Sequence, residues 1–222
     1  MEGTTSVLCT ERMGQVMKAS ERQYWKVKRG MDILLSLALI VVCSPVMLLI
    51  ALLIVLDDPH TGPVFKQTRF GLRGKPFTMY KFRTMIADAE SRLEELREQN
   101  EMDGPVFKIR DDPRITRVGR VLRKLSLDEL PQFFNVLKGD LSMIGPRPPL
   151  PCEAAEYTEY QKLRLYVKPG LSCSWQVRKG RNDVEFEEWV EDDINYILNA
   201  SLWLDIKLFL QTPVAMLRGG GC

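Results

Sequence analysis

The residues best suited to chemistry lie in one short segment, where two acids follow a cluster of cations. Asp128 and Glu129 come directly after seven Lys and Arg side chains crowded into seventeen positions, against Asp111 and Asp112. The cluster consists of Lys108, Arg110, Arg114, Arg117, Arg120, Arg123 and Lys124. Such cations can bind phosphate groups, or they can form a solvated face beside a membrane. A carboxylate beside them should stay ionised where phosphates collect, and it can attack phosphorus to give an acyl phosphate. The plainer alternative for both acids is stabilisation of a helix N-terminus.

The composition excludes several other kinds of site. The chain has 222 residues and one histidine, His60, so histidine triads and multi-histidine metal centres are not expected. Its five cysteines are widely spaced without a C-x-x-C pair, which argues against a zinc site or a disulfide framework. With 31 basic and 29 acidic residues, the chain is too balanced for a dedicated nucleic-acid binder.

The local pattern places the two acids at the start of a helix. Ser126 and Glu129 have the S-x-x-E spacing of a capping box, and an apolar helical face follows until Gly139, a natural helix end. The segments after Gly62 and at 77–82 are typical of short strands. An amphipathic surface helix is expected over 86–100. The predicted fold class is therefore α+β and mostly helical.

A long apolar segment near the N-terminus predicts membrane insertion. Residues 33–56 carry no charge, and a straight helix of this length covers about 36 Å. That exceeds the hydrocarbon core of about 30 Å. Ser44-Pro45 falls in the middle and predicts a bend. Because Lys and Arg residues flank the segment on both sides, the positive-inside rule favours a re-entrant helix over a spanning one.

The C-terminal region carries a second apolar stripe. Between Ile194 and Leu217 apolar residues recur at helical spacing, with Tyr196 and Trp203 beside them. The stripe fits a helix lying in the membrane interface, and equally a helix that packs over the core.

Several long segments resemble the bacterial sugar transferase family, the monotopic polyprenyl-phosphate phosphoglycosyl transferases. The longest is RKLSLDELPQFFNVLKGDLSMIGPRP at 123–148, and the similarity covers about residues 26–217. The other matching segments are the apolar run broken at Ser44-Pro45, Tyr80–Met85, Lys168–Gly170, Gln176-Val177 and Gly180-Arg181.

This resemblance implies an enzyme. Asp128 would attack the sugar-linked phosphate of a UDP-sugar, release UMP and pass the phosphosugar to undecaprenyl phosphate. Glu129 would ligate Mg²⁺, which suits a hard cation shared with phosphates. Phosphate or carboxylate groups of the substrates would be held by Lys81, Arg123, Arg147 and Arg181. Cys173-Ser174-Trp175-Gln176 replaces the Gly-Trp-Ala-Gln of smaller members, and this resembles the exopolysaccharide-priming branch. The substitution favours UDP-glucose or UDP-galactose as the donor.

The resemblance also implies an organisation on the cytoplasmic face of the bacterial inner membrane. The expected parts are a basic segment over 1–30, a re-entrant helix over 31–57 and a catalytic domain over 58–222 with a C-terminal interfacial helix. The expected partners are the UDP-sugar, undecaprenyl phosphate and membrane lipids, without nucleic acid, and a homodimer is compatible with the sequence. The alternatives are a non-catalytic scaffold that binds anionic lipids, and an ordinary glycosyltransferase, which would release UDP.

Overall fold

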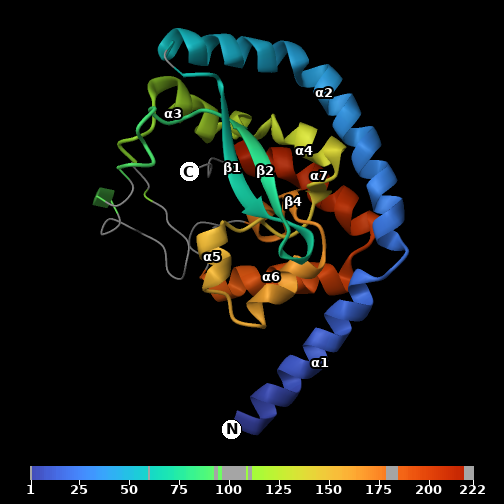
Figure 1. The fold of residues 1–222 in the computed structure, drawn as a ribbon. Helices are drawn as coiled ribbons and strands as arrows, with labels where there is room; N and C mark the ends of the chain where they lie inside the picture. Colours follow the sequence, from blue (N-terminus) through green and yellow to red (C-terminus); the bar gives the residue numbers. More distant parts are fainter. Residues whose placement is uncertain are drawn as a thin grey trace.

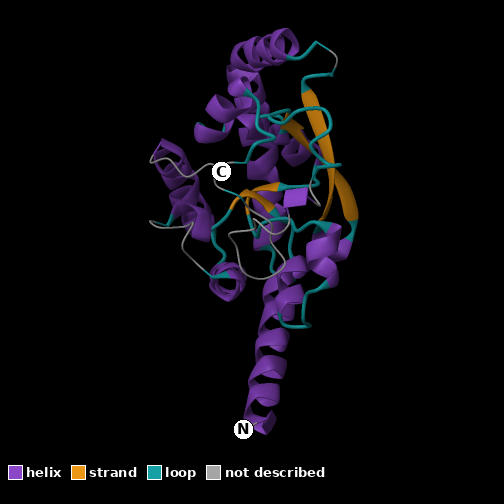
Figure 2. Cartoon of the chain, turned by 90° about the vertical axis from the view of Figure 1, so that its left-hand side faces the viewer, coloured by secondary structure: helices purple, strands orange, loops and turns teal. Residues whose placement is uncertain are grey.

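The computed structural model describes residues 2–59, 61–92, 95–96, 109, 112–178 and 185–217. The protein is mostly helical with two small sheets, which confirms the predicted α+β class (Figures 1 and 2). The main helices and strands are α1 (Glu2–Ser20), α2 (Tyr24–Asp57), β1 (Val64–Phe70), β2 (Pro76–Phe82), α3 (Arg117–Lys124), α4 (Gln132–Lys138), β3 (Ser142–Ile144), α5 (Pro151–Ala155), β4 (Gly170–Ser172), α6 (Phe186–Asn199) and α7 (Leu202–Leu217). Short 3-10 turns cover Leu72–Gly74, Leu127–Glu129, Gln161–Tyr166 and Trp175–Val177.

Helix α2 contains the whole apolar segment. It runs unbroken through Pro45, so the predicted break is a bend within one helix. Figure 1 shows α2 rising along one side of the molecule, bending about halfway and then crossing its top. Most of its large apolar side chains are exposed, which is costly in water and favourable in lipid. Among the described helices, α2 alone is long and apolar enough to cross a membrane.

Buried polar contacts fix the first half of α2 to the rest of the protein. The Lys28 ammonium pairs with the Asp205 carboxylate of α7 at 2.6 Å, and both side chains are almost fully buried. The Asp32 carboxylate accepts a hydrogen bond of 3.0 Å from the Ser142 hydroxyl of β3. The Arg29 guanidinium donates to two carbonyls in the last turn of α4. A buried charge that loses its partner costs free energy, so these contacts fix the position of α2 on the rest of the protein.

The second half of α2 packs on the same body. Ile50 and Ile54 are buried against Phe82 at the end of β2 and Leu122 of α3. Both halves of the bent helix are therefore held by the same folded body.

Strands β1 and β2 form an antiparallel hairpin, with Val64 opposite Phe82 and Phe70 opposite Pro76. This confirms the two predicted strands. Helix α4 is fixed on β2 by Asn135, whose side-chain amide accepts from the Tyr80 N–H at 3.0 Å and donates to the Thr78 carbonyl at 2.7 Å.

Strands β3 and β4 pair in parallel within the main core. Two glycines make this pairing close, since a Cβ on Gly170 would lie 2.1 Å from the backbone nitrogen of Gly145. No larger residue fits there without a shift of the backbone.

Two predictions from helical periodicity are corrected by the structure. Among the described residues of the surface helix expected over 86–100, residues 87–92 form turns and 95–96 lie in a short 3-10 segment, so none of them is α-helical. The C-terminal stripe is divided at Ala200-Ser201 into two helices with different roles. Helix α6 belongs to the buried core, whereas α7 buries Leu208 on one side and exposes apolar side chains on the other. The exposed side chains are Leu202, Trp203, Ile206, Leu210 and Val214.

Candidate active site

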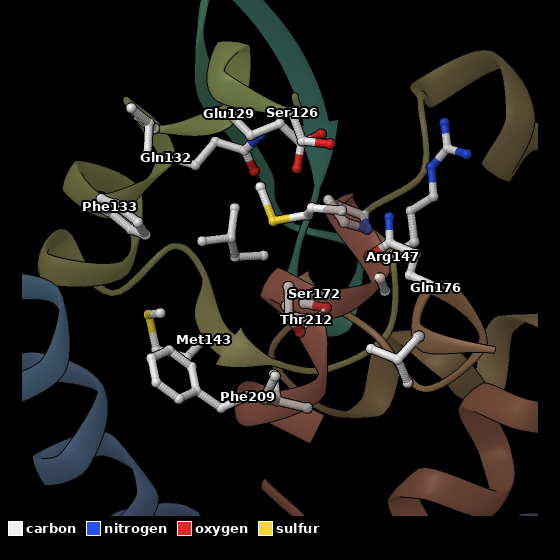
Figure 3. Close-up of a pocket in the computed structure, with 18 of the residues that line it drawn as sticks. Ser126, Glu129, Gln132, Phe133, Met143, Arg147, Ser172, Gln176, Phe209 and Thr212 are labelled. Carbon is white, nitrogen blue, oxygen red and sulfur yellow. Dashed lines mark hydrogen bonds between the residues drawn. The ribbon is translucent and has the colours of Figure 1, made fainter. Parts of the chain in front are cut away.

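A cavity of about 370 Å³ lies beside Glu129 and is lined by residues from nearly every part of the fold. Its polar lining includes Lys81 of β2, Arg69 of β1 and Arg147 after β3. Figure 3 shows Ser126 and Glu129 at the top, Arg147 and Gln176 on the right, and apolar side chains at the left and below. The cavity therefore has a charged side and an apolar side.

The segment carrying the two acids folds differently from the predicted capping box. Ser126 has a left-handed backbone with φ of 52°, and its side chain caps nothing. The Glu129 carboxylate instead accepts a hydrogen bond of 2.9 Å from the Lys81 ammonium. The prediction is wrong because an N-cap residue needs an extended backbone and because Glu129 finds a charged partner on another strand. The predicted end of the following helix at Gly139 is confirmed, with φ of 101°.

Asp128 is buried beside two cations. Its side chain is only 8% exposed, and burial raises its pKa from 3.8 to about 6. The charge of Lys81 opposes this rise, the neighbouring charge of Glu129 adds to it, and Arg123 opposes it. The carboxylate is therefore mostly ionised at neutral pH but poorly solvated, a condition that favours its use as a nucleophile.

Arg123 is positioned by the loop that follows β2. Its guanidinium Nε donates to the Thr84 hydroxyl at 2.9 Å. Helix α3 can approach this loop because Gly119 lies against it, and a Cβ there would come within 2.1 Å of the Thr84 carbonyl oxygen. Thr116 caps the same helix by accepting from the Gly119 N–H.

Arg69 is a site residue that the sequence analysis did not single out. It lines the cavity although it is 7% exposed, and it donates to the Pro148 carbonyl at 3.1 Å. Burial and, to a smaller extent, the nearby charge of Arg147 lower the pKa of Arg69 to about 10. A lone arginine in a strand carries no signal of this role, because its burial depends on the loop around Pro148.

The structure brings together part of the predicted site. Lys81, Glu129 and Arg147 line the cavity. Asp128 and Arg123 do not line it, but both lie in the same charged group as Lys81. Arg181 lies outside the described residues, as do Lys108 and Arg110 of the basic cluster.

Arg114 has a structural role within that basic cluster. Its guanidinium pairs with the buried Asp112 carboxylate at 2.6 Å and donates to the Ala89 carbonyl. Within the described part of the cluster, Arg114 thus holds loops together and Arg123 lies near Asp128, whereas Arg117, Arg120 and Lys124 are exposed.

The charged side also fits a magnesium ion. Among the described residues no three acid, histidine or cysteine side chains are grouped as a metal site. Mg²⁺ is nevertheless often held by one or two carboxylates together with substrate phosphates. Glu129 offers one carboxylate at the cavity, so the residues suit an ion that arrives with a diphosphate.

Comparison with known proteins identifies the family. Residues 23–219 match the sequence profile described as bacterial sugar transferase. The chain belongs to this family. The chain is similar to the Salmonella typhimurium undecaprenyl-phosphate galactose phosphotransferase, with 41% identity over 88% of this chain and 41% of the relative.

Two further bacterial sugar transferases show similar identity. The Aeromonas hydrophila UDP-N-acetylgalactosamine-undecaprenyl-phosphate N-acetylgalactosaminephosphotransferase is 42% identical over 89% of this chain and 45% of its own length. The Escherichia coli UDP-glucose:undecaprenyl-phosphate glucose-1-phosphate transferase is 40% identical over 84% of this chain and 39% of its own length. The chain thus spans less than half the length of these three relatives. Their names share the lipid acceptor and differ in the sugar.

Proposed function

We propose that this bacterial sugar transferase moves hexose 1-phosphate from a UDP-sugar to undecaprenyl phosphate through a phosphosugar bound covalently to Asp128. The observation that carries the proposal is a buried, poorly solvated aspartate beside Lys81 and Arg123, next to a cavity with further cations. The names of the relatives supply the two substrates.

The reaction runs in two displacements at one phosphorus atom. A carboxylate oxygen of Asp128 attacks the sugar-linked phosphorus, and the bond from that phosphorus to the oxygen shared with UMP breaks. UMP leaves with this electron pair. A phosphate oxygen of the lipid then attacks the same phosphorus, and the acyl-phosphate bond breaks. The product is undecaprenyl diphosphate hexose, and the Asp128 carboxylate is restored.

The charged side chains fit the demands of these steps. Phosphoryl transfer is catalysed mainly by positioning and by stabilising charge on phosphate oxygens. Lys81, Arg69 and Arg147 bring fixed positive charge to the cavity, and Arg123 lies beside the nucleophile. Glu129 would hold Mg²⁺ together with the diphosphate, and this ion would neutralise charge on the leaving UMP. The Glu129 carboxylate would then contact both the ion and the Lys81 ammonium.

The packing of α2 supports a re-entrant helix. Lys28 and Asp32 anchor its first half to the body, while Ile50 and Ile54 anchor its second half. A helix that spans the bilayer would separate its two ends by the hydrocarbon core, and one small domain could not hold both. The Lys and Arg residues on both flanks favour the cytoplasmic face. The enzyme would therefore work where the lipid headgroups lie.

Nucleotide release tests the proposed reaction. The chain in detergent or nanodiscs is supplied with Mg²⁺ and with UDP-glucose, UDP-galactose or UDP-N-acetylgalactosamine, with and without undecaprenyl phosphate. We expect UMP with a hexose donor, in amounts above the enzyme concentration only when the lipid is present. Asp128→Asn should abolish release, and the exposed-acid control Glu156→Gln should leave it unchanged. Release of UDP would indicate an ordinary glycosyltransferase, and lipid binding without nucleotide release would indicate a scaffold.

A further inference from the structure

The apolar side of the cavity has no part in the phosphate chemistry proposed above. It is built from Leu39 of α2, Phe133 of α4, Met143 of β3, and Phe209 and Met216 of α7. In Figure 3 the labelled members of this group lie toward the ribbon of α2 and away from Arg147. The membrane helix therefore forms part of the wall of the cavity.

Two hydroxyl groups in this part of the lining are already paired with one another. The Thr212 hydroxyl donates to the Leu208 carbonyl at 2.8 Å, and it lies 2.9 Å from the Ser172 hydroxyl. When Thr212 donates to the carbonyl, Ser172 donates to Thr212, and neither hydroxyl has a proton left for a ligand. The oxygen and nitrogen acceptors of a sugar or a base placed here would find no hydrogen-bond donor, which is unfavourable in a buried site.

Unpaired donors occur elsewhere in the lining. Trp175 and Trp189 stack with ring centroids 4.2 Å apart, and both line the cavity. Their buried indole N–H groups have no hydrogen-bond partner in the described part of the chain. Trp175 precedes Gln176, which lies beside Arg147 in Figure 3. Because Arg147 brings a positive charge to this part of the lining, the polar UDP-sugar is better placed on the side of Arg147 than on the side of α2.

The cavity also reaches the surface at the end of α7. Pro213 lines it and is exposed, while Ala215 and Met216 line it and are half-buried. The neighbouring Val214 is 48% exposed and does not line the cavity. This edge of α7 belongs to a helix with a row of exposed apolar side chains, and so it suits contact with lipid.

We infer that the apolar side of the cavity, between α2 and α7, receives the isoprenoid chain next to the phosphate of the lipid acceptor. This inference rests on the proposed function. The cavity holds only the first part of the chain, because about 370 Å³ is the size of a small-ligand pocket, and the rest stays in the bilayer. Because the lipid tails of the bilayer are as apolar as this lining, moving the isoprenoid chain into the cavity adds little binding free energy. The lining instead orients the acceptor phosphate toward Asp128.

Two pairs of tryptophan substitutions test the inference. Ala215→Trp and Leu39→Trp fill the apolar side from α7 and from α2. Val214→Trp and Leu37→Trp are the matched controls, since both residues are about half exposed on the same helices and neither lines the cavity. Each variant is measured in two assays. The first is exchange of labelled UMP into UDP-sugar without lipid, which needs only the donor step, and the second is transfer to undecaprenyl phosphate.

We expect the cavity variants to keep UMP exchange within about twofold of the unsubstituted chain, because the donor side is untouched. Transfer to the lipid should fall about tenfold or more, because a misplaced acceptor phosphate loses its alignment with phosphorus. Both controls should keep both activities. Equal loss of exchange and transfer in Ala215→Trp and Leu39→Trp would overturn the inference, and so would unchanged transfer. Absence of exchange in the unsubstituted chain would overturn the proposed function instead.

Discussion

Replacing the proposed nucleophile with its neutral isostere should stabilise the protein while abolishing its activity. Asp128 is nearly buried, and burial outweighs the attraction of Lys81 and Arg123, so its pKa rises to about 6. The folded state therefore binds a proton more tightly than the unfolded state does. The ionised carboxylate is kept at a cost in stability, as is common at active sites.

The size of this cost follows from the pKa. A rise from 3.8 to about 6 is roughly two units, and each unit corresponds to about 1.4 kcal/mol, so the cost is at most about 3 kcal/mol. This net shift already includes the neighbouring charges. Because the folded pKa is raised, the contribution of Asp128 to stability is full below about pH 4 and is lost as the pH rises through about 6. Asp128→Asn removes this pH dependence.

Thermal unfolding followed by tryptophan fluorescence in nanodiscs measures the effect. We expect Asp128→Asn to raise Tm at about pH 7.5 by up to roughly 6–12 °C, since 1 kcal/mol moves Tm by about 2–4 °C at this chain length. Near pH 4 the two proteins should unfold at similar temperatures. Glu156→Gln, at an exposed acid, is the control and should change little at either pH. If Asp128→Asn were less stable than the unsubstituted protein at about pH 7.5, or if the difference in Tm were the same at both pH values, then burial of the ionised Asp128 carboxylate would not be what lowers the stability.

Three further substitutions, one of them with a matched control, test other contacts. Lys81→Met removes the largest charge that lowers the pKa of Asp128, so the acid limb of the pH profile for UMP release should move to higher pH; an unmoved limb would contradict the assignment. Gly170→Ala should lower the free energy of unfolding by about 1–3 kcal/mol because the added Cβ meets the backbone, whereas Gly30→Ala, in open space on a helix, should raise it by up to about 1 kcal/mol. Lys28→Met leaves its α7 partner buried without a cation and should cost about 3–5 kcal/mol in the same melts; a smaller loss than Gly170→Ala would argue against a role in fixing α2.

Local sequence patterns are sufficient to predict the elements that depend only on the composition of a continuous stretch of the chain. The charge-free run predicts α2, and Ser44-Pro45 predicts a bend within it. The strand at 77–82 and the glycine that ends α4 follow from local rules as well. The juxtaposition of Asp128 with Arg123 is predictable because the two residues are close in the chain.

Features that depend on tertiary packing were not predictable. Lys81 and Glu129 are 48 positions apart, and only the folding of β2 against the turn at 127–129 brings them together. The same contact removes Glu129 from the capping box that its spacing suggests. The division between α6 and α7 was likewise not predictable, and α7 contacts α2 through the buried pair of Asp205 with Lys28, which lies 177 positions earlier. Arg69 becomes a site residue only through the loop that covers it.

The mass of the intact protein after reaction with the donor alone shows directly whether a phosphosugar becomes bound to Asp128. The chain is mixed with Mg²⁺ and UDP-galactose or UDP-glucose without lipid acceptor, quenched in acid and examined by mass spectrometry with peptide mapping. We expect the added mass of one hexose phosphate on the peptide that contains Asp128, its absence in Asp128→Asn, and its disappearance when undecaprenyl phosphate is added before quenching. Lipid-dependent UMP release without any such adduct, or an adduct on another residue, would contradict the proposed covalent intermediate.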